Sequence, residues 1–382
     1  MLIDRTIFQQ IKKALQSEPK IIIIYGPRQA GKTTLLNQLV ENIKQPFLAL
    51  SGDNLQVQKA IQPDYNLLKN VIGDKKLVTI DEAQHIENIG LSLKIIYDQL
   101  HLPILVTGSF SFDLANKINE PLTGRTSTFH LYPLSFTESP QDQLEMDPKL
   151  KIEPYLRFGS YPKVITTTDT DLKRKYLDEL VNNYLYHDLL EFRSIRKPKK
   201  IVDLLSLLAL QIGSEVSINE LSSNLDIERS SVEKYLDILE KMFVIVNLRG
   251  FSRNLRKEIY KTSKYYFVDL GVRNVLIQNF NSMNLRSDAG ALFENFCIIE
   301  RIKFINNNQK YANYYFWRTY NQKEIDLIEE SESKLNAFEF KWSPRNEKIS
   351  SAYNEFEKVY KNTTYNLITP TSFKSFSIKV EI

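Results

Sequence analysis

The apolar residues in the first half of the chain form short continuous runs, and segments with helical spacing separate these runs. A short apolar run is typical of a strand that a parallel sheet buries on both faces. Such runs predict strands at Lys20–Tyr25, Phe47–Leu50, Lys76–Ile80 and Pro103–Thr107. Helical spacing predicts helices at Thr34–Val40, Leu55–Val71 and Leu91–Leu100. This alternation predicts βαβ units, and therefore an α/β domain on a parallel sheet.

The middle of the chain changes to a mainly helical pattern. Helices are predicted at residues 172–195, Ile201–Ile212, Ser217–Leu225 and Arg229–Met242. Two strand-like runs follow, Phe243–Leu248 and Tyr265–Val268. Helix, turn, helix and then a β-ribbon is the pattern of a winged helix-turn-helix. The buried face of its third helix is predicted to comprise Val232, Tyr235, Leu236 and Leu239.

The chain after Ser287 predicts a second α/β region. Its predicted elements are a helix at Ala289–Phe304, strands at Tyr314–Arg318, Glu324–Glu329 and Lys334–Phe340, a helix at Lys348–Tyr360, and a strand at Tyr365–Ile368. We therefore expect four parts, at residues 1–150, 151–195, 196–285 and 286–382.

Composition narrows the class of protein. The chain has 382 residues, of which 42% are hydrophobic and 25% charged, and these fractions exclude a disordered or fibrous chain. Cys297 is the single cysteine, so neither an internal disulfide nor a cysteine-rich zinc site can form. No apolar run approaches the roughly 18 residues of a membrane span, and the N-terminus lacks the apolar core of a signal peptide. We expect a cytoplasmic protein with no membrane partner.

The most specific motif is GPRQAGKT, which matches G-x-x-x-x-G-K-[ST]. Gly26 and Gly31 let backbone N–H groups point at phosphate oxygens, Lys32 reaches the β- and γ-phosphates, and the Thr33 hydroxyl binds Mg²⁺. The motif lies between a predicted strand and a predicted helix, the context that phosphate binding requires. The predicted ATP contacts are Gly26, Pro27, Arg28, Gln29, Ala30, Gly31, Lys32, Thr33 and Thr34.

Three further segments provide candidate catalytic groups. In LVTIDEAQ, Asp81 would complete the Mg²⁺ shell and Glu82 would polarise the attacking water, which predicts ATP hydrolysis as well as binding. Ser109, in TGSFS, either senses the γ-phosphate or caps the following helix. Arg125, in LTGR, either contacts phosphate, in its own or a neighbouring protomer, or forms a structural ion pair.

The net charge of +4 is unevenly distributed. Residues 1–150 carry 15 Lys and Arg against 16 Asp and Glu, and residues 151–382 carry 35 against 30. One basic cluster, RSIRKPKK at Arg193–Lys200, is a predicted hinge. The other is the predicted wing, where Glu258 is the sole acid among Arg249, Arg253, Arg256, Lys257, Lys261 and Lys264.

The predicted wing suits phosphate contacts that carry no base readout. The third helix disfavours sequence-specific binding, because Glu228–Lys241 holds four acids and three bases. We therefore expect non-specific nucleic-acid contact, and the alternative is a protein-docking module with a solvated basic loop.

The last region contains the pattern Asp326, then Glu339-x-Lys341 on the next strand. Glu339 and Lys341 are two residues apart and would project to the same side of that strand. This is the arrangement of PD-(D/E)xK nucleases, in which Asp326 and Glu339, with Glu294 from the preceding helix, would bind Mg²⁺ or Mn²⁺. Lys341 would orient or activate the attacking water. A solvated sheet face with alternating charges is the alternative.

Together these motifs resemble the AAA-type ATPases of bacteria and archaea that carry a C-terminal DUF4143 domain. Beyond the generic P-loop, the resemblance rests on LTGR (122–125), LYPLSFTE (131–138) and FGSYP (158–162), and it extends over essentially the whole chain. In FGSYP, Ser160 stands where we expect a second glycine. The resemblance implies an ATPase core (1–150), a helical linker (151–195), a winged helix (196–285) and a nuclease-like α/β domain (286–382).

These expectations combine into a Mg²⁺-dependent ATPase that couples its nucleotide state to a C-terminal DNA-binding module, with DNA cleavage left open. The alternative is an ATP-controlled binding switch that docks protein or DNA partners through an inactive nuclease-like domain. A DNA-binding regulator with ATP as its ligand is a third reading. A homo-oligomer also stays open, because the sequence does not decide whether Arg125 acts within one protomer.

Overall fold

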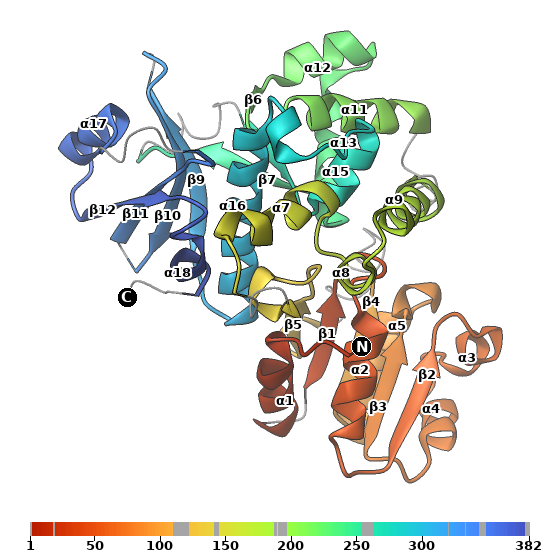
Figure 1. The fold of residues 1–382 in the computed structure, drawn as a ribbon. Coiled ribbons are helices and arrows are strands. Elements are labelled where there is room, and N and C mark those ends of the chain that lie inside the picture. Colours follow the sequence, from red (N-terminus) through yellow and green to blue (C-terminus); the bar gives the residue numbers. More distant parts are fainter. Residues whose placement is uncertain are drawn as a thin grey trace. The chain divides into compact units, whose positions relative to one another are not determined.

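The computed structural model describes residues 2–17, 20–109, 122–140, 145–186, 189, 197–253, 263–319, 321–332, 334–343 and 349–378. The chain divides into two compact units (Figure 1). Unit 1 comprises residues 1–134 with the short segments 241–243 and 306–309. Unit 2 comprises residues 135–240, 244–305 and 310–382.

Unit 1 is built on a parallel sheet with the strand order β2-β3-β4-β1-β5. Its strands are β1 (Ile21–Tyr25), β2 (Phe47–Ser51), β3 (Leu77–Asp81), β4 (Ile104–Gly108) and β5 (Thr126–His130). Its helices are α1 (Ile7–Ser17), α2 (Lys32–Glu41), α3 (Leu55–Ala60), α4 (Tyr65–Ile72) and α5 (Ile89–Leu100). The predicted α/β fold and its predicted strands are confirmed.

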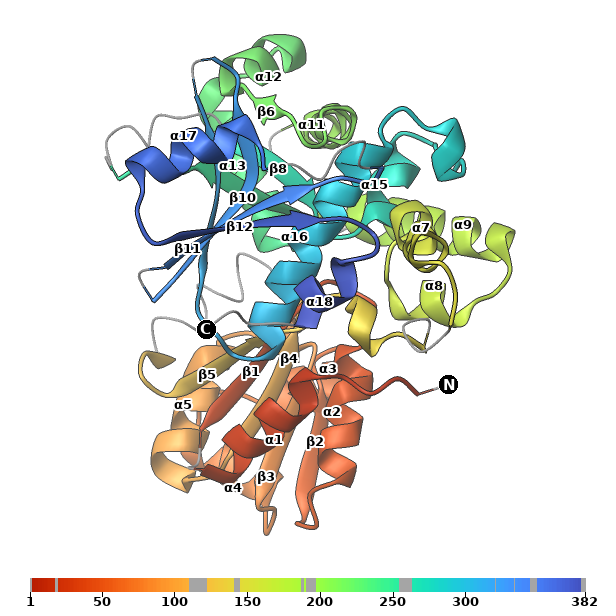
Figure 2. The same cartoon turned by 60° about the vertical axis from the view of Figure 1, so that its left-hand side comes forward.

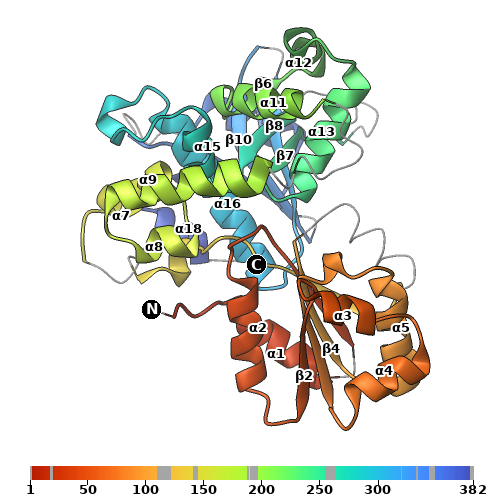
Figure 3. The same ribbon diagram turned by 90° about the vertical axis from the view of Figure 1, so that its right-hand side faces the viewer.

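Helices cover both faces of this sheet, as Figure 3 shows. On one face, α1 and α2 pack on Ile22 and Ile24 of β1. On the other, α4 and α5 pack on Ile21 and Ile23 of the same strand. Alternate residues of a strand point to opposite faces, so four consecutive isoleucines bury both sides of β1.

Two details of unit 1 differ from the expectation. The predicted helix Leu55–Val71 is two helices, because Pro63 interrupts it and Asp64 caps α4 by accepting a 2.8 Å hydrogen bond from Leu67 N. Strand β5 was not predicted, since its sequence TSTFH has no continuous apolar run. It pairs with β1 as a sheet edge, and only Phe129 is fully buried.

Unit 2 contains a mixed sheet with the order β12-β11-β10-β9-β7-β8-β6. The strands are β6 (Glu215–Val216), β7 (Ile245–Gly250), β8 (Ser263–Phe267), β9 (Asn313–Arg318), β10 (Glu324–Ser331), β11 (Lys334–Phe340) and β12 (Thr363–Ile368). A parallel pairing of β7 with β9 joins the antiparallel β7-β8-β6 ribbon to the strands β9–β12. Figure 2 shows β10, β11 and β12 beside α17.

Unit 2 has a helix at each predicted position, with shifted ends. It also has helices where none was predicted, at Pro148–Phe158, Pro162–Thr166, Leu270–Leu276 and Phe373–Ile378. The helices of unit 2 are α7 (Pro148–Phe158), α8 (Pro162–Thr166), α9 (Thr170–Glu179), the π-helix η4 (Leu180–Leu185), α11 (Pro198–Leu210), α12 (Ile218–Leu225), α13 (Arg229–Lys241), α15 (Leu270–Leu276), α16 (Ala289–Asn307), α17 (Ser351–Val359) and α18 (Phe373–Ile378). Short 3-10 turns lie at η1 (Ala83–His85) in unit 1 and at η2 (Phe136–Glu138) and η5 (Met283–Leu285) in unit 2.

The segment FGSYP has a structural role in unit 2. Gly159 has φ 73° and ψ −159°, and a Cβ there would lie 2.0 Å from Asp269 Oδ1. Ser160 N donates to Asp269 Oδ2 at 2.7 Å, and Asp269 in turn caps α15. Lys303 donates to Ser160 Oγ at 3.0 Å and to Glu300 Oε1 at 2.8 Å. Ser160 therefore supplies a hydroxyl to a buried polar network, which the expected glycine would not.

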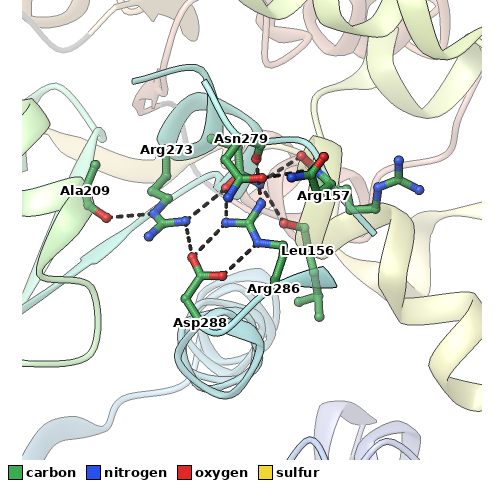
Figure 4. A network of polar contacts seen from close by, with 9 residues as sticks. Leu156, Arg157, Ala209, Arg273, Asn279, Arg286 and Asp288 are labelled. Carbon is green, nitrogen blue, oxygen red and sulfur yellow. Dashed lines mark hydrogen bonds and ion pairs between the residues drawn. The ribbon is translucent and has the colours of Figure 1, made fainter. Parts of the chain in front are cut away.

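A second buried network joins the end of α15 to the start of α16 (Figure 4). Arg273 donates to Asp288 Oδ2 at 2.7 Å, and Arg286 donates to both carboxylate oxygens of Asp288 at 2.8 and 2.7 Å. Arg273 also donates to the backbone oxygen of Ala209 at 2.8 Å. The two guanidinium groups are almost fully buried. The carboxylate of Asp288 offsets part of their charge and accepts hydrogen bonds from both.

Candidate nucleotide site

The phosphate loop runs from the end of β1 to the start of α2. Gly31, the N-cap of α2, has φ 97°, a conformation that side-chain-bearing residues rarely adopt. Gly26 lies so close to the neighbouring backbone that a Cβ would come within 2.2 Å of Leu131 O. Both glycines of the motif are therefore required by the backbone path, and the path places the N-terminus of α2 at the loop.

Lys32 is the first residue of α2 and is only 4% exposed. Its ammonium donates to the backbone oxygens of Gly26 and Pro27, each at 3.1 Å. It also donates to Ser109 Oγ at 3.3 Å. The structure thus brings Ser109, from the segment after β4, to the lysine of the phosphate loop.

Thr33 and Asp81 meet beside the loop. Thr33 Oγ1 donates to Asp81 Oδ2 at 2.7 Å, and the hydroxyl of Thr107 donates to Asp81 Oδ1. A hydroxyl and a carboxylate at a phosphate loop are the oxygen ligands that Mg²⁺ takes together with phosphate oxygens and water. This donor set fits the ion that the motif implies.

Glu82 has a left-handed backbone, with φ 47° and ψ 47°. Its N–H donates to Thr107 Oγ1 at 3.3 Å, and its carboxylate accepts from Gln84 Nε2 at 2.5 Å. Gly52 allows the backbone to approach, because a Cβ there would lie 2.1 Å from Glu82 O. Left-handed non-glycine residues cost about 1–3 kcal/mol and cluster at functional sites. Here Gly52, Thr107 and Gln84 hold the conformation.

Two of the three predicted metal ligands of the C-terminal region, Glu294 and Asp326, lie near each other, and the third, Glu339, has another partner. Glu339 Oε2 accepts a 3.1 Å hydrogen bond from Tyr365 on β12. Asp326 instead lies near Glu294 and Lys341, and burial and the carboxylate of Glu294 raise its pKa to about 8. Within the described ranges, no three carboxylate, imidazole or thiolate groups are close enough to hold a metal ion. The three-ligand set of Glu294, Asp326 and Glu339 therefore stays a prediction, and two of its members lie near each other.

Lys264 also lies differently from the expectation. It was predicted to be a phosphate contact on an exposed loop, but its side chain is 1% exposed and its ammonium contacts Glu294 and Glu324. Burial lowers the pKa of Lys264, and the two carboxylates more than offset this, so the pKa is raised. A buried, paired ammonium cannot bind a nucleic-acid phosphate from solvent.

Of the other predicted wing residues, Arg249 is exposed, and Arg253 is 60% exposed with an ion pair to Glu330 at 2.9 Å. Arg256, Lys257 and Lys261 lie outside the described residues, as do residues 193–196 of the predicted hinge.

Comparisons with known proteins agree with this geometry. A family model for an AAA domain matches residues 18–139, and one for the domain of unknown function DUF4143 matches residues 289–380. The chain carries an AAA domain and a DUF4143 domain. A model for a further domain of unknown function, DUF8612, matches residues 149–283 between them.

Relatives and one solved structure extend the comparison. An uncharacterized protein of Methanocaldococcus jannaschii is 27% identical over 82% of this chain and 73% of its own length. An uncharacterized protein of Mycobacterium tuberculosis is 28% identical over 89% of this chain and 74% of its own. A Walker-type ATPase of Pyrococcus abyssi superposes with a TM-score of 0.51 at 19% identity, covering 72% of this chain and 96% of that one. At this identity the likeness is one of fold.

Arg125 of the AAA domain lies away from the phosphate loop. It precedes β5, and its backbone oxygen accepts from Ile21 N, at the edge of the sheet where β1 begins. The phosphate loop follows the other end of β1. The guanidinium donates to both carboxylate oxygens of Asp98, at 2.8 and 3.1 Å, so Arg125 forms the structural ion pair that was one of its two predicted roles.

Two residues at the site of the AAA domain were not singled out from the sequence. Arg5 donates to the backbone oxygens of Ala30 and Tyr132, at 2.9 and 2.7 Å, and so braces the phosphate loop. Thr107 links Asp81 to Glu82. Thr107 stands in the same TGS segment as Ser109, so this motif could have identified it from the sequence. Arg5 precedes α1 with no motif around it, so nothing in the sequence indicated its role.

Membrane insertion of a helix finds no candidate in the part of the chain that the structure describes, where every helix is too short or too polar to span a bilayer.

Proposed function

We propose that this chain is a Mg²⁺-dependent ATPase whose nucleotide state controls a nucleic-acid-binding module in its C-terminal part. The hydrogen bond from Thr33 to Asp81 carries the first half of the proposal, because it joins the phosphate loop to the acidic end of β3. The likeness to a Walker-type ATPase and the match to an AAA domain support the same half.

Each residue of the site has its own proposed role in hydrolysis. Backbone N–H groups at Gly31 and Lys32 bind phosphate oxygens, and the ammonium of Lys32 neutralises their charge. Thr33 and Asp81 would hold Mg²⁺, which would neutralise the charge that develops on the phosphates. Glu82, fixed at Oε2 by Gln84, orients the attacking water and accepts its proton. Ser109, at 3.3 Å from Lys32, keeps that ammonium at the loop.

Two variants test the ATPase. Lys32→Ala is expected to lose nucleotide binding, and Glu82→Gln to bind ATP but hydrolyse it poorly. Lys59→Ala and Glu87→Gln are matched controls, because both side chains are exposed and lie outside the phosphate-loop contacts. Equilibrium binding of a fluorescent ATP analogue and release of phosphate would be measured for all four. Near-normal ATP turnover in both site variants would contradict the proposed ATPase activity.

The second half of the proposal rests on element order and charge. The order α11-β6-α12-α13-β7-β8, with β7, β8 and β6 in an antiparallel ribbon, supports a winged helix. Arg249, near the end of β7, and Arg253, in the β7–β8 connection, are exposed and suit phosphate contacts. Four acids on residues 228–241 disfavour reading of base edges by α13. We infer non-specific binding to the nucleic-acid backbone.

Binding is tested with labelled duplex DNA, single-stranded DNA and RNA, with and without ATP in the Glu82→Gln background. The affinity should fall steeply with salt, and Arg249→Ala with Arg253→Ala should reduce the salt slope by about two. Glu228→Gln with Glu233→Gln is a control that leaves the wing unchanged. Absence of binding to every probe in both nucleotide states would contradict this half.

A binding switch that cuts nothing is the second candidate, and the pairing of Glu339 with Tyr365 favours it over a nuclease. Incubation of plasmid and single-stranded DNA with Mg²⁺ or Mn²⁺, with and without ATP, separates the two. Cleavage that Asp326→Ala and Lys341→Ala abolish would establish the nuclease. Intact substrates with normal ATP turnover would support the switch.

A further inference from the structure

Lys264 is the positively charged centre of a buried group of acids in unit 2. It lies on β8, and its ammonium contacts Glu324 Oε1 of β10 and lies 3.4 Å from Glu294 Oε1 of α16. The ring of Phe316 closes another side, with its centroid 5.6 Å from Nζ. Strands β8 and β10 and helix α16 are far apart in sequence, so the fold itself gathers these groups.

The surrounding side chains are organised around this ammonium. Tyr266 donates to Glu294 Oε1 at 2.6 Å, the same oxygen that faces Lys264. Arg318 lies 3.6 Å from Glu324 Oε2. Asp326, 8% exposed, accepts from Phe340 N at 2.8 Å and lies within the field of Lys264 and Lys341. The carboxylates of this cluster therefore already have cationic or hydrogen-bonding partners.

A divalent ion would need the same positions. Mg²⁺ and Mn²⁺ bind carboxylate oxygens directly, and a protein that binds them supplies converging oxygens with open coordination positions. Here the ammonium stands between Glu294 and Glu324, Tyr266 uses an oxygen of Glu294, and Glu339 is bonded to Tyr365. A divalent cation next to a buried ammonium would also be repelled by it.

We propose that Lys264 is a built-in cation of the Glu294–Glu324–Asp326 cluster and keeps this cluster free of divalent metal. The inference rests on the proposed reading of the C-terminal part as a module that binds without cutting. The cluster is then a structural junction between the β7-β8-β6 ribbon and the strands β9–β12, both within unit 2. The ammonium of Lys264 gives the cluster a positive charge whether or not divalent metal ions are available.

Mn²⁺ binding tests the proposal in the full chain. An Asp81→Asn background removes the metal-binding carboxylate of the AAA domain, and Mn²⁺ binding is followed by electron paramagnetic resonance without nucleotide. We expect no Mn²⁺ site in this parent, a gained site on adding Lys264→Met, and its loss again on adding Asp326→Asn. Lys334→Met is the matched control and should gain no site, because Lys334 is exposed at the start of β11, the opposite end from Phe340, which contacts Asp326.

Two outcomes overturn the proposal. One is Mn²⁺ binding by the Asp81→Asn parent that Asp326→Asn abolishes, and the other is a folded Lys264→Met chain that gains no site. Neither outcome depends on ATP turnover. The Mn²⁺ test of Lys264 can therefore fail while the ATPase test succeeds, and the reverse is equally distinguishable.

A second measurement uses the unmodified protein, in case Lys264→Met does not fold. An amine-reactive label read by mass spectrometry should modify exposed lysines such as Lys341 and leave Lys264 unmodified, with or without Mn²⁺. Labelling of Lys264 that appears on adding Mn²⁺ would show that the metal displaces the ammonium, and would contradict the proposal.

Discussion

Thr33 and Asp81 are 48 residues apart in sequence, and the hydroxyl of one donates a 2.7 Å hydrogen bond to the carboxylate of the other. Thr33 belongs to α2 directly after the phosphate loop, and Asp81 ends β3. Because β3, β4 and β1 are parallel neighbours, their carboxyl ends lie at one edge of the sheet. This edge holds the loop, the acids and the residues that position them.

Thr107→Val is expected to lower ATP turnover while preserving nucleotide binding. The hydroxyl of Thr107 contacts both Asp81 Oδ1 and Glu82 N, and valine keeps the volume but neither bond. Loss of a group that orients a metal ligand typically costs about 10- to 100-fold. Thr79→Val is the matched control, because Thr79 is also buried and its hydroxyl bonds to Leu48 O on β2. Equal turnover in the two variants would contradict the prediction.

Gln84→Ala is expected to slow hydrolysis by about tenfold with unchanged ATP affinity, since one hydrogen bond to a charged group is worth about 1.5 kcal/mol. The amide of Gln84 holds the carboxylate of Glu82 at 2.5 Å, so its loss lets Glu82 leave the position from which it orients water. Single-turnover measurements would separate hydrolysis from binding. A raised dissociation constant with unchanged hydrolysis would show that Gln84 acts on binding instead.

Arg125→Ala is expected to leave ATP turnover of the isolated protomer unchanged. Arg125 pairs with Asp98 at the edge of the sheet where β1 begins, and the phosphate loop is at the other. Asp98→Ala should produce the same small decrease in melting temperature, because each variant breaks the same half-buried pair. A loss of turnover that grows with protein concentration would instead indicate that Arg125 acts on the nucleotide of a neighbouring protomer.

Asp288→Asn is expected to destabilise unit 2 by roughly 2 kcal/mol at pH 7. Burial raises the pKa of Asp288, but hydrogen bonds from Arg286 and Arg273 outweigh this and lower the pKa to about 2. A carboxylate with a lowered pKa contributes stability above its unfolded pKa of 3.8, and this contribution is lost as the pH falls through 2. Denaturant unfolding between pH 7 and pH 2 should show the two proteins converging. Asp203→Asn is the control, and a difference that persists at pH 2 would contradict the assignment.

Gly159→Ala is expected to destabilise unit 2 by roughly 2–5 kcal/mol, because alanine cannot adopt this backbone without strain and its Cβ would clash with Asp269. Gly290→Ala is the matched control, since a Cβ there meets no atom within 4 Å. Thermal unfolding of both variants tests the prediction. Similar melting temperatures would show that the FGSYP turn does not need its glycine.

Much of unit 1 could be predicted from the sequence because its determinants are local. Four consecutive isoleucines require a strand buried on both faces, and β1 has this environment. The phosphate loop follows from Gly26, Gly31, Lys32 and Thr33, which stand in one short motif between a strand and a helix. Strand β5 escaped prediction because TSTFH owes its place to pairing with β1 rather than to its own apolar residues.

The C-terminal acids show what spacing along a strand cannot decide. Glu339 and Lys341 are two residues apart, and Asp326 lies on the neighbouring strand, so the pattern predicted one metal site. The pairing of β10 with β9 shifts register between Ile325 and Ile328. In the fold, Asp326 lies near Glu294 on α16, whereas Glu339 bonds to Tyr365 on β12.

By itself, the sequence determined the phosphate loop, its acidic partner strand and the order of the elements, because each depends on residues close together in the chain. Only the tertiary structure decided which side chain each charged residue meets. Counted along the chain, Lys264 is one of several bases in a loop, and in the fold it is an interior cation held by two carboxylates. Burial removes water as the default partner, so the role of a charge is decided by the strands and helices that pack around it.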